Sequence, residues 1–137
     1  MIVVDASALA KLLLREEGWR LVHQSLAEEQ AMTVDHALKE VLNAVWKAAR
    51  ICGLIPRRLA LEKEALLHTM VERGVLRVED ERRYLREAFR IALDTGLTVY
   101  DSLYIAQAMA HRAPLLTCDT RQAEAAASLG VEPKLIP

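Results

Sequence analysis

Five short, mainly apolar runs alternate with longer amphipathic segments along the chain. The runs lie at residues 1–4, 31–34, 75–78, 115–118 and 133–136. Short apolar runs bounded by polar or turn-forming residues are typical of buried strands. The pattern therefore predicts a sheet of about five strands.

The longer segments repeat apolar residues at helical spacing. Residues 36–51 form the clearest case and stop at Gly53. Their apolar face consists of Leu38, Val41, Leu42, Val45 and Ala49. Further helices are expected at residues 7–15, 19–29, 56–71, 80–94, 101–111 and 120–129. Strands that alternate with helices predict an α/β fold, in which a mostly parallel sheet lies between helices on both faces.

Length and composition agree with one folded unit. The 137 residues are 53% hydrophobic and 27% charged, without repeats or a Gly/Ser linker, so we expect residues 1–137 to form a single domain. The apolar runs are far shorter than the ~20 residues of a membrane span. No basic stretch with a cleavage site precedes Ile2, and Cys52 lies far from Cys118, so we expect a cytoplasmic protein with reduced thiols.

The net charge of −1 does not favour a nucleic-acid binder, since such domains usually carry a basic excess. A protein of this charge could still bind phosphates if bound metal ions, and not only basic side chains, contacted them. The charge thus counts modestly against a nucleic-acid substrate.

Four acidic residues nevertheless fall at one edge of the predicted sheet. Asp5 and Asp119 directly follow strands. Asp101 opens a helix, and Glu40 lies in the first turns of the helix after the second strand. Because sites in open parallel sheets form at the carboxyl ends of the strands, we expect these four side chains to converge there.

Converging carboxylates cannot all stay ionised in a partly buried pocket without positive charge. Mg²⁺ or Mn²⁺ would supply it, because hard cations prefer carboxylate and water oxygens, and no His/Cys pattern supports zinc. One or two such ions can activate water and stabilise the leaving oxygen of a phosphodiester. The acids therefore suggest metal-dependent phosphodiester hydrolysis.

Each acid also has a simpler interpretation. Asp5, Asp101 and Asp119 stand near predicted helix N-termini, where aspartate is favoured as a cap. Glu40 alone could be a solvated or salt-bridged residue. Asn43 shares a helix face with Glu40, where it could hold that carboxylate or a bound water.

Around these acids the sequence resembles the PIN-domain family and, in size and layout, the toxin ribonucleases of the VapBC toxin–antitoxin class. The matching stretches are VVDAS, EVLN, YDSLYIA and LLTCD, at residues 3–7, 40–43, 100–106 and 115–119. They occur in the family's order and spacing and span nearly the whole chain. One departure is visible: the family often has a proline before the glutamate helix, where this chain has Asp35 and His36. His36 could contact the site, but a capping or surface role is the favoured interpretation.

The resemblance implies a three-layer α/β/α domain that cleaves RNA with Mg²⁺ or Mn²⁺, usually as a dimer held by a cognate antitoxin. The family's catalytic, metal-binding acids map onto Asp5, Glu40, Asp101 and Asp119, and its site hydroxyls map onto Ser7 and Thr117. Ser7 could equally cap a helix, and Thr117 could tie its hydroxyl to the backbone.

Candidate RNA contacts are basic residues that could border the acids. Arg121 follows Asp119 by two residues and should lie near the rim, and Lys11 and Lys39 could add to it. The arginines of residues 82–90 alternate with acids, which favours a salt-bridged, solvated face over an RNA-binding strip.

Other functions share parts of this pattern. A receiver-like phosphoacceptor would need paired acids after the first strand, and Asp5 has no acidic neighbour. A non-catalytic PIN-like module that binds RNA or protein would have no need of four converging acids. Cleavage of DNA stays open, since no identifiable residue reads the 2′-hydroxyl.

Two protein partners are expected. Surplus apolar helix surface suggests a homodimer, with candidate contacts that could equally pack internally: Leu54, Ile55, Leu59, Leu66 and Leu67. A free ribonuclease would be harmful in the cytoplasm, so we also expect a small antitoxin that occupies the acidic pocket. An arginine suits that role, because its planar fork can bridge two carboxylates.

Overall fold

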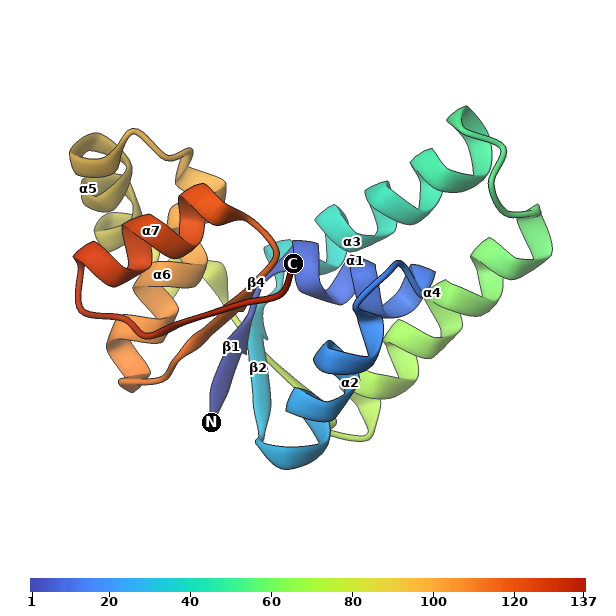
Figure 1. Ribbon diagram of the computed structural model, residues 1–137, viewed down its shortest axis with the longest axis horizontal. Helices are drawn as coiled ribbons and strands as arrows, with labels where there is room; N and C mark the ends of the chain where they lie inside the picture. The colour runs from blue at the N-terminus through green and yellow to red at the C-terminus, as the bar shows by residue number, and fades with distance from the viewer.

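A parallel sheet runs through the middle of the computed structural model, which describes residues 1–137 (Figure 1). Its strands are β1 (Ile2–Val4), β2 (Ala31–Val34), β3 (Leu76–Glu79), β4 (Leu115–Thr117) and β5 (Pro133–Leu135). Their order is β3-β2-β1-β4-β5, and every neighbouring pair is parallel. The prediction of five strands in a parallel sheet is therefore confirmed.

Helices form a layer on each side of this sheet, so the fold is three-layer α/β/α as expected (Figure 1). One layer holds α1 (Ala6–Leu14), α2 (Trp19–Glu28), α3 (His36–Trp46) and α4 (Arg57–Glu72). The other holds α5 (Leu85–Thr95), α6 (Val99–His111) and α7 (Thr120–Ser128). No helix has both the length and the apolar character needed to cross a membrane.

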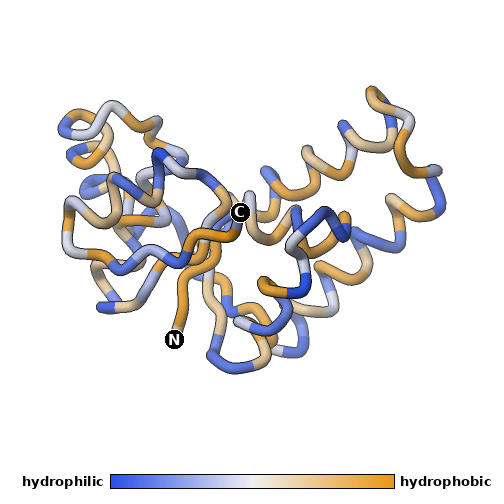
Figure 2. The backbone as a smooth tube through the Cα atoms, viewed as in Figure 1, coloured by the Kyte–Doolittle hydropathy of each residue, from blue (hydrophilic) through white to orange (hydrophobic).

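Strands β1, β2 and β4 are buried along their whole length. Figure 2 shows these strands as an apolar centre between helices of mixed polarity. With so few aromatic residues, aliphatic side chains from α1 and α6, such as Leu9, Leu13, Leu103 and Ile105, fill the core on either side of the sheet. The rigid centre fixes the carboxyl ends of the strands, from which the candidate site is built.

The helices differ from the predictions mainly at their ends. The helix expected at residues 36–51 is α3 followed by a π-helical turn, η1 (Lys47–Ile51). The helix expected at residues 80–94 is a 3-10 turn, η2 (Glu81–Arg83), followed by α5. The break arises because Asp80 caps the short turn by accepting the Arg82 backbone N–H at 2.9 Å.

Two arginines of the 80–94 segment form ion pairs with acids of the same segment. Arg82 pairs with Asp80 at 2.6 Å, and Arg90 lies 3.7 Å from Glu87. Both arginines are mostly exposed, so these pairs add little stability. The interpretation of this segment as a salt-bridged, solvated face is confirmed.

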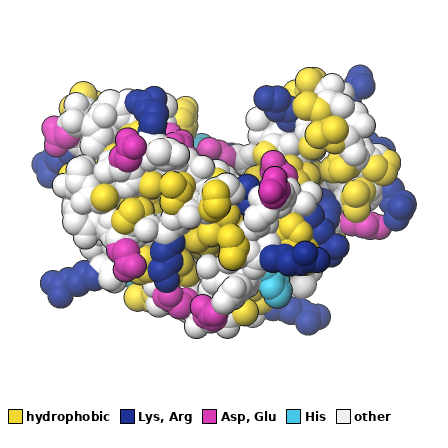
Figure 3. Space-filling view, in the orientation of Figure 1, with side chains coloured by type: hydrophobic (Ala, Val, Ile, Leu, Met, Phe, Trp, Pro, Cys, Tyr) yellow, Lys and Arg dark blue, Asp and Glu magenta, His cyan; other side chains and the backbone are white.

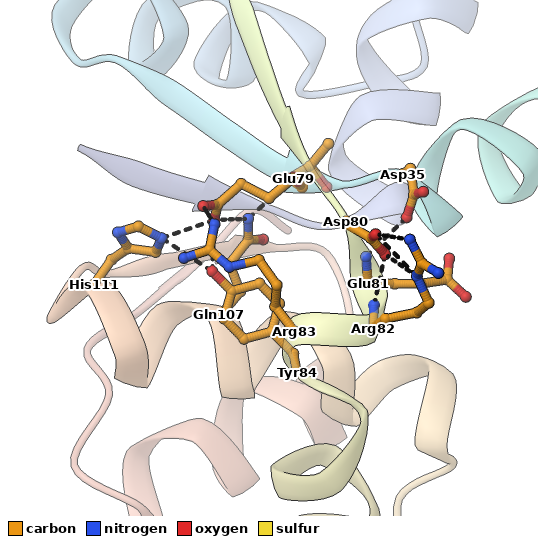
Figure 4. A network of polar contacts seen from close by, with 10 residues as sticks. Asp35, Glu79, Asp80, Glu81, Arg82, Arg83, Tyr84, Gln107 and His111 are labelled. Atoms are coloured by element: carbon orange, nitrogen blue, oxygen red, sulfur yellow. Dashed lines mark hydrogen bonds and ion pairs between the residues drawn. The ribbon is translucent and has the colours of Figure 1, made fainter.

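Glu79 lies buried at the end of β3, in a polar network with residues of α6 and the α5 region (Figure 4). Its Oε1 accepts hydrogen bonds from Tyr84 Oη at 2.6 Å and Gln107 Nε2 at 3.0 Å and lies 2.7 Å from His111 Nε2, while Arg83 pairs with Oε2. Burial alone would raise the pKa of Glu79, but these hydrogen bonds outweigh it and lower the pKa to about 2. These neighbours supply hydrogen bonds to the Glu79 carboxylate, and the contacts connect β3 to the layer of α5, α6 and α7.

Candidate functional site

Four helices begin around the carboxyl edge of the sheet. Helices α1, α3 and α7 directly follow β1, β2 and β4, and α6 begins beside them (Figure 1). Figure 3 shows a notch between the two halves of the molecule, with acidic side chains inside it. The acids identified from the sequence all lie in the first turns or at the caps of these helices: Asp5, Glu40, Asp101 and Asp119.

Asp5 is 3% exposed and is held from three directions. As the N-cap of α1 it accepts the Ala8 N–H at 2.9 Å. Ser7 Oγ donates to its Oδ1 at 2.7 Å, and Thr117 Oγ1 donates to its Oδ2 at 2.6 Å. Burial nevertheless raises the pKa of Asp5 to about 6. The ionised carboxylate is therefore costly when no cation is bound.

Ser7 and Thr117 connect Asp5 to the start of α7. The Cys118 N–H donates to Ser7 Oγ at 3.0 Å, and the Asp119 N–H donates to Thr117 Oγ1 at 3.0 Å. Ser7 is not the helix cap, because Asp5 takes that position. The Thr117 hydroxyl accepts from the backbone, as its simpler interpretation held, and also contacts Asp5.

Asp119 caps α7, since its Oδ1 accepts the Arg121 N–H at 2.8 Å and the Gln122 N–H at 3.2 Å. Capping therefore holds for Asp5 and Asp119, without preventing their other oxygens from binding a ligand. Asp101 is not a cap, because the Thr98 hydroxyl accepts the Asp101 N–H and α6 begins before it.

The pKa of Asp101 shows that Asp119 and Glu40 lie close enough to act on it electrostatically. Burial raises this pKa first, and the negative charges of Asp119 and Glu40 raise it further, while Arg121 opposes them weakly. Asp101 in turn raises the pKa of Asp5 slightly. The four carboxylates thus share one region of negative potential.

Glu40 is oriented by Tyr104, which the sequence did not single out, and by His36. Tyr104, a buried residue of α6, donates its hydroxyl to Glu40 Oε1 at 2.7 Å. His36 Nε2 lies 3.1 Å from the same oxygen. Tyr104 follows Asp101 by three residues, so helical spacing already placed the two on one face of α6.

Two interpretations of the helix that carries Glu40 need correction. Asn43 is exposed and makes no side-chain hydrogen bond, because the rotation of α3 turns it to solvent; Tyr104 and His36 hold the carboxylate instead. His36 is not a surface residue, since its side chain is 13% exposed and contacts Glu40.

The three candidate RNA-contact residues differ in how available their charged groups are. Arg121 is exposed and close enough to lower the pKa of Asp101. Lys39 is exposed beside Glu40 in the sequence. The Lys11 ammonium is occupied, since it donates to the backbone carbonyls of Glu17 at 2.8 Å and Pro137 at 3.4 Å. Lys11 is thus a poorer candidate for an RNA contact.

As the side chains stand, no three His, Cys, Asp or Glu residues lie close enough to hold one metal ion. The chemistry of the donors nevertheless fits a hard divalent cation, because all four are carboxylates and because burial and like charge raise the pKa values of Asp5 and Asp101. A bound cation would offset both the burial of these carboxylates and the repulsion between them. The residues present therefore fit Mg²⁺ or Mn²⁺, and convergence on one ion stays a prediction.

Comparison with known proteins adds an independent finding. A family model described as PIN domain matches residues 2–128. Ribonuclease VapC3 of Pyrobaculum aerophilum is 39% identical over 127 residues, which cover 90% of this chain and 92% of that protein. The crystal structure of PAE2754 from Pyrobaculum aerophilum matches with a TM-score of 0.70 and 26% identity, over 96% of this chain and 87% of the other. A chain of a toxin–antitoxin complex from Klebsiella pneumoniae matches with a TM-score of 0.65 and 17% identity, over 90% of each chain.

Proposed function

This chain belongs to the PIN-domain family, and from that premise we propose that it is a metal-dependent endoribonuclease and the toxin of a toxin–antitoxin pair. One observation carries the proposal: acids from four separate helix starts share one sheet edge, where the negative charges of Asp119 and Glu40 raise the pKa of Asp101 after burial does, and the charge of Asp101 adds to the burial that raises the pKa of Asp5. The likeness to a protein named as a ribonuclease supports RNA as the substrate. In this proposal residues 1–137 act as one domain in the cytoplasm, where RNA is available.

The proposed metal ligands are Asp5, Glu40, Asp101 and Asp119, with Mg²⁺ or Mn²⁺ as the ion. A bound ion of this kind lowers the pKa of a water and neutralises charge on the leaving oxygen. The protein's own contribution is orientation: Ser7 and Thr117 fix the Asp5 carboxylate, and Tyr104 fixes that of Glu40. Asn43 lies too far into solvent to share that task, although it could still hold a bound water.

Cleavage should depend strictly on the divalent ion. We expect a mixed-sequence single-stranded RNA to be cut in Mg²⁺ or Mn²⁺, to stay intact in EDTA, and to be cut again when the ion is restored. The reason is that the clustered acids would otherwise repel the phosphodiester. Gel analysis of end-labelled RNA, beside a DNA of the same sequence, measures this. Cleavage that persists in EDTA would contradict the metal proposal, and preferential cleavage of the DNA would contradict the substrate.

We further propose a small antitoxin partner that inserts a basic side chain among the four acids. The acids lie in the first turns or at the caps of helices that begin at one sheet edge, and a guanidinium could bridge two of them as a substitute for the cation. The likeness to a chain of a toxin–antitoxin complex supports such a partner.

A homodimer is also proposed, with fewer candidate contact residues than the sequence suggested. Leu67 is 3% exposed and packs in the core, whereas Leu54 is 75% and Leu66 is 47% exposed. Trp46, the last residue of α3, and Ile51, the last residue of η1, add exposed apolar surface shortly before Leu54 in the chain. Sedimentation at tens of micromolar should give a dimer, and Leu54→Glu should shift it toward monomer. A monomer in the unaltered protein would rule the dimer out, since a standard interface holds at this concentration.

A further inference from the structure

We propose that the Tyr100 ring, stacked on His36, is a platform on which one unpaired base of the substrate stacks. The inference rests on the proposed function for the nature of the ligand, and it adds a binding residue outside the four acids. It also assigns a use to the Tyr100 ring, which the proposed metal chemistry does not need.

The two rings form a parallel stack. Their centroids lie 4.9 Å apart and their planes differ by 16°. The His36 side chain is 13% exposed, whereas Tyr100 is 59% exposed. Because His36 covers one face of the tyrosine ring, much of the exposed area must lie on the opposite face. That open face is the surface that a base could cover.

The stack stands directly beside the acids. Tyr100 precedes Asp101 in the first turn of α6, and His36 is the first residue of α3, one turn before Glu40. His36 Nε2 lies 3.1 Å from Glu40 Oε1, so Glu40, a proposed metal ligand, also holds the His36 ring against which Tyr100 stacks. A base on Tyr100 would therefore hold its own phosphodiester chain within reach of the carboxylates.

Tyr100 differs from the other exposed aromatic side chains. Trp46 is 52% exposed and Phe89 is 56% exposed, but neither stacks on another ring. A ring that is already held in place loses less conformational freedom when a ligand binds to it. Tyr100 is thus the exposed aromatic residue that is prepared for stacking.

The chemistry points to single-stranded nucleic acid. Every base has a π-face, but bases inside a duplex are not free to cover an aromatic side chain. Stacking also answers the difficulty raised by the net charge of −1, because it supplies affinity that does not depend on a basic surface. The platform should therefore favour unpaired segments with little preference among the bases.

Binding of a labelled 12-nucleotide RNA, measured by fluorescence anisotropy with Ca²⁺ in place of Mg²⁺, tests the platform against an abasic RNA of the same length. Tyr100→Leu should weaken binding of the base-containing RNA about 5- to 100-fold and leave binding of the abasic RNA unchanged. Tyr100→Phe keeps the ring and should stay within about twofold of the unaltered protein. Phe89→Leu removes an aromatic ring of similar exposure on α5 and should change neither affinity.

Equal weakening for both RNAs, or no weakening in Tyr100→Leu, would overturn the proposal. His36→Ala serves if Tyr100→Leu does not fold: loss of the supporting ring should weaken binding of the base-containing RNA alone, and an equal loss for both RNAs overturns the platform. The nuclease function fails separately. If the unaltered protein cuts no RNA but Tyr100→Leu still weakens binding of the base-containing RNA alone, the platform stands and the nuclease function fails. If the unaltered protein cuts RNA but Tyr100→Leu does not weaken binding of the base-containing RNA alone, the nuclease function stands and the platform fails.

Discussion

Replacing Asp101 by asparagine is expected to slow RNA cleavage by more than about 100-fold, while the protein stays folded. Substitutions that only disturb the orientation of a metal ligand typically cost about 10- to 100-fold, so loss of a ligand's charge should cost more. Asp101 is the suitable position, because its pKa is raised by burial and then by Asp119 and Glu40. Asparagine keeps the shape of the side chain and removes only the charge. Single-turnover cleavage in Mg²⁺ or Mn²⁺ measures the loss.

Asp94→Asn is the matched control for this experiment. Asp94 is an exposed aspartate of α5 that takes part in no ion pair, so its charge should be irrelevant to cleavage. Melting curves of both variants show whether the fold is intact. Cleavage by Asp101→Asn at the rate of the unaltered protein would remove Asp101 from the site, and an equal loss in Asp94→Asn would mean that only net charge matters.

The strands and the positions of the acids could be predicted because both depend on local sequence. A buried parallel strand reads as a short apolar run, and the residue after it necessarily lies at the carboxyl edge. Asp5 and Asp119 follow β1 and β4 in this way. Glu40 and Asp101 do not directly follow a strand, and their position at this edge comes from the helices that carry them: Glu40 lies one turn into α3, and Asp101 lies in the first turn of α6.

The contact of Glu40 with Tyr104 could not be predicted, since it depends on how two helices pack across the site. Spacing along α3 suggested Asn43, but helical periodicity does not fix the rotation of the helix against its neighbours. In the structure the contact comes from Tyr104, 64 positions away in the chain. Glu79 was missed for a similar reason: it precedes a solvated charged segment, and only the tertiary fold brings Gln107 and His111 to it.

Replacing Asp5 by asparagine is expected to stabilise the metal-free protein near neutral pH and to reduce its response to metal. The pKa of Asp5 is raised from 3.8 to about 6, so between these values the folded state binds more protons than the unfolded state. Stability contributed by this group therefore falls as pH rises through that window, and above about 6 the whole cost, about 3 kcal/mol, is present. Asparagine does not ionise and avoids that cost.

Asparagine should fit the same place. Its oxygen can still cap α1 by accepting the Ala8 N–H, and its amide can donate to Thr117 Oγ1, which lies 2.9 Å from Gln122 Oε1 and can donate there instead. The local hydrogen bonds are thus kept while the charge is lost.

Melting temperatures between pH 4 and 8, in EDTA and in Mg²⁺, separate the two effects. In EDTA the unaltered protein should lose stability relative to Asp5→Asn as pH rises from about 4 to about 6, and by pH 7.5 the variant should melt several degrees higher. Mg²⁺ should raise the melting temperature of the unaltered protein, because a ligand of the native state stabilises it, and should raise that of the variant much less. An equal Mg²⁺ response in both proteins would mean that Asp5 does not hold the ion. If the difference in melting temperature between the two proteins in EDTA stays constant across the pH range, the charge of Asp5 is not what destabilises the metal-free fold.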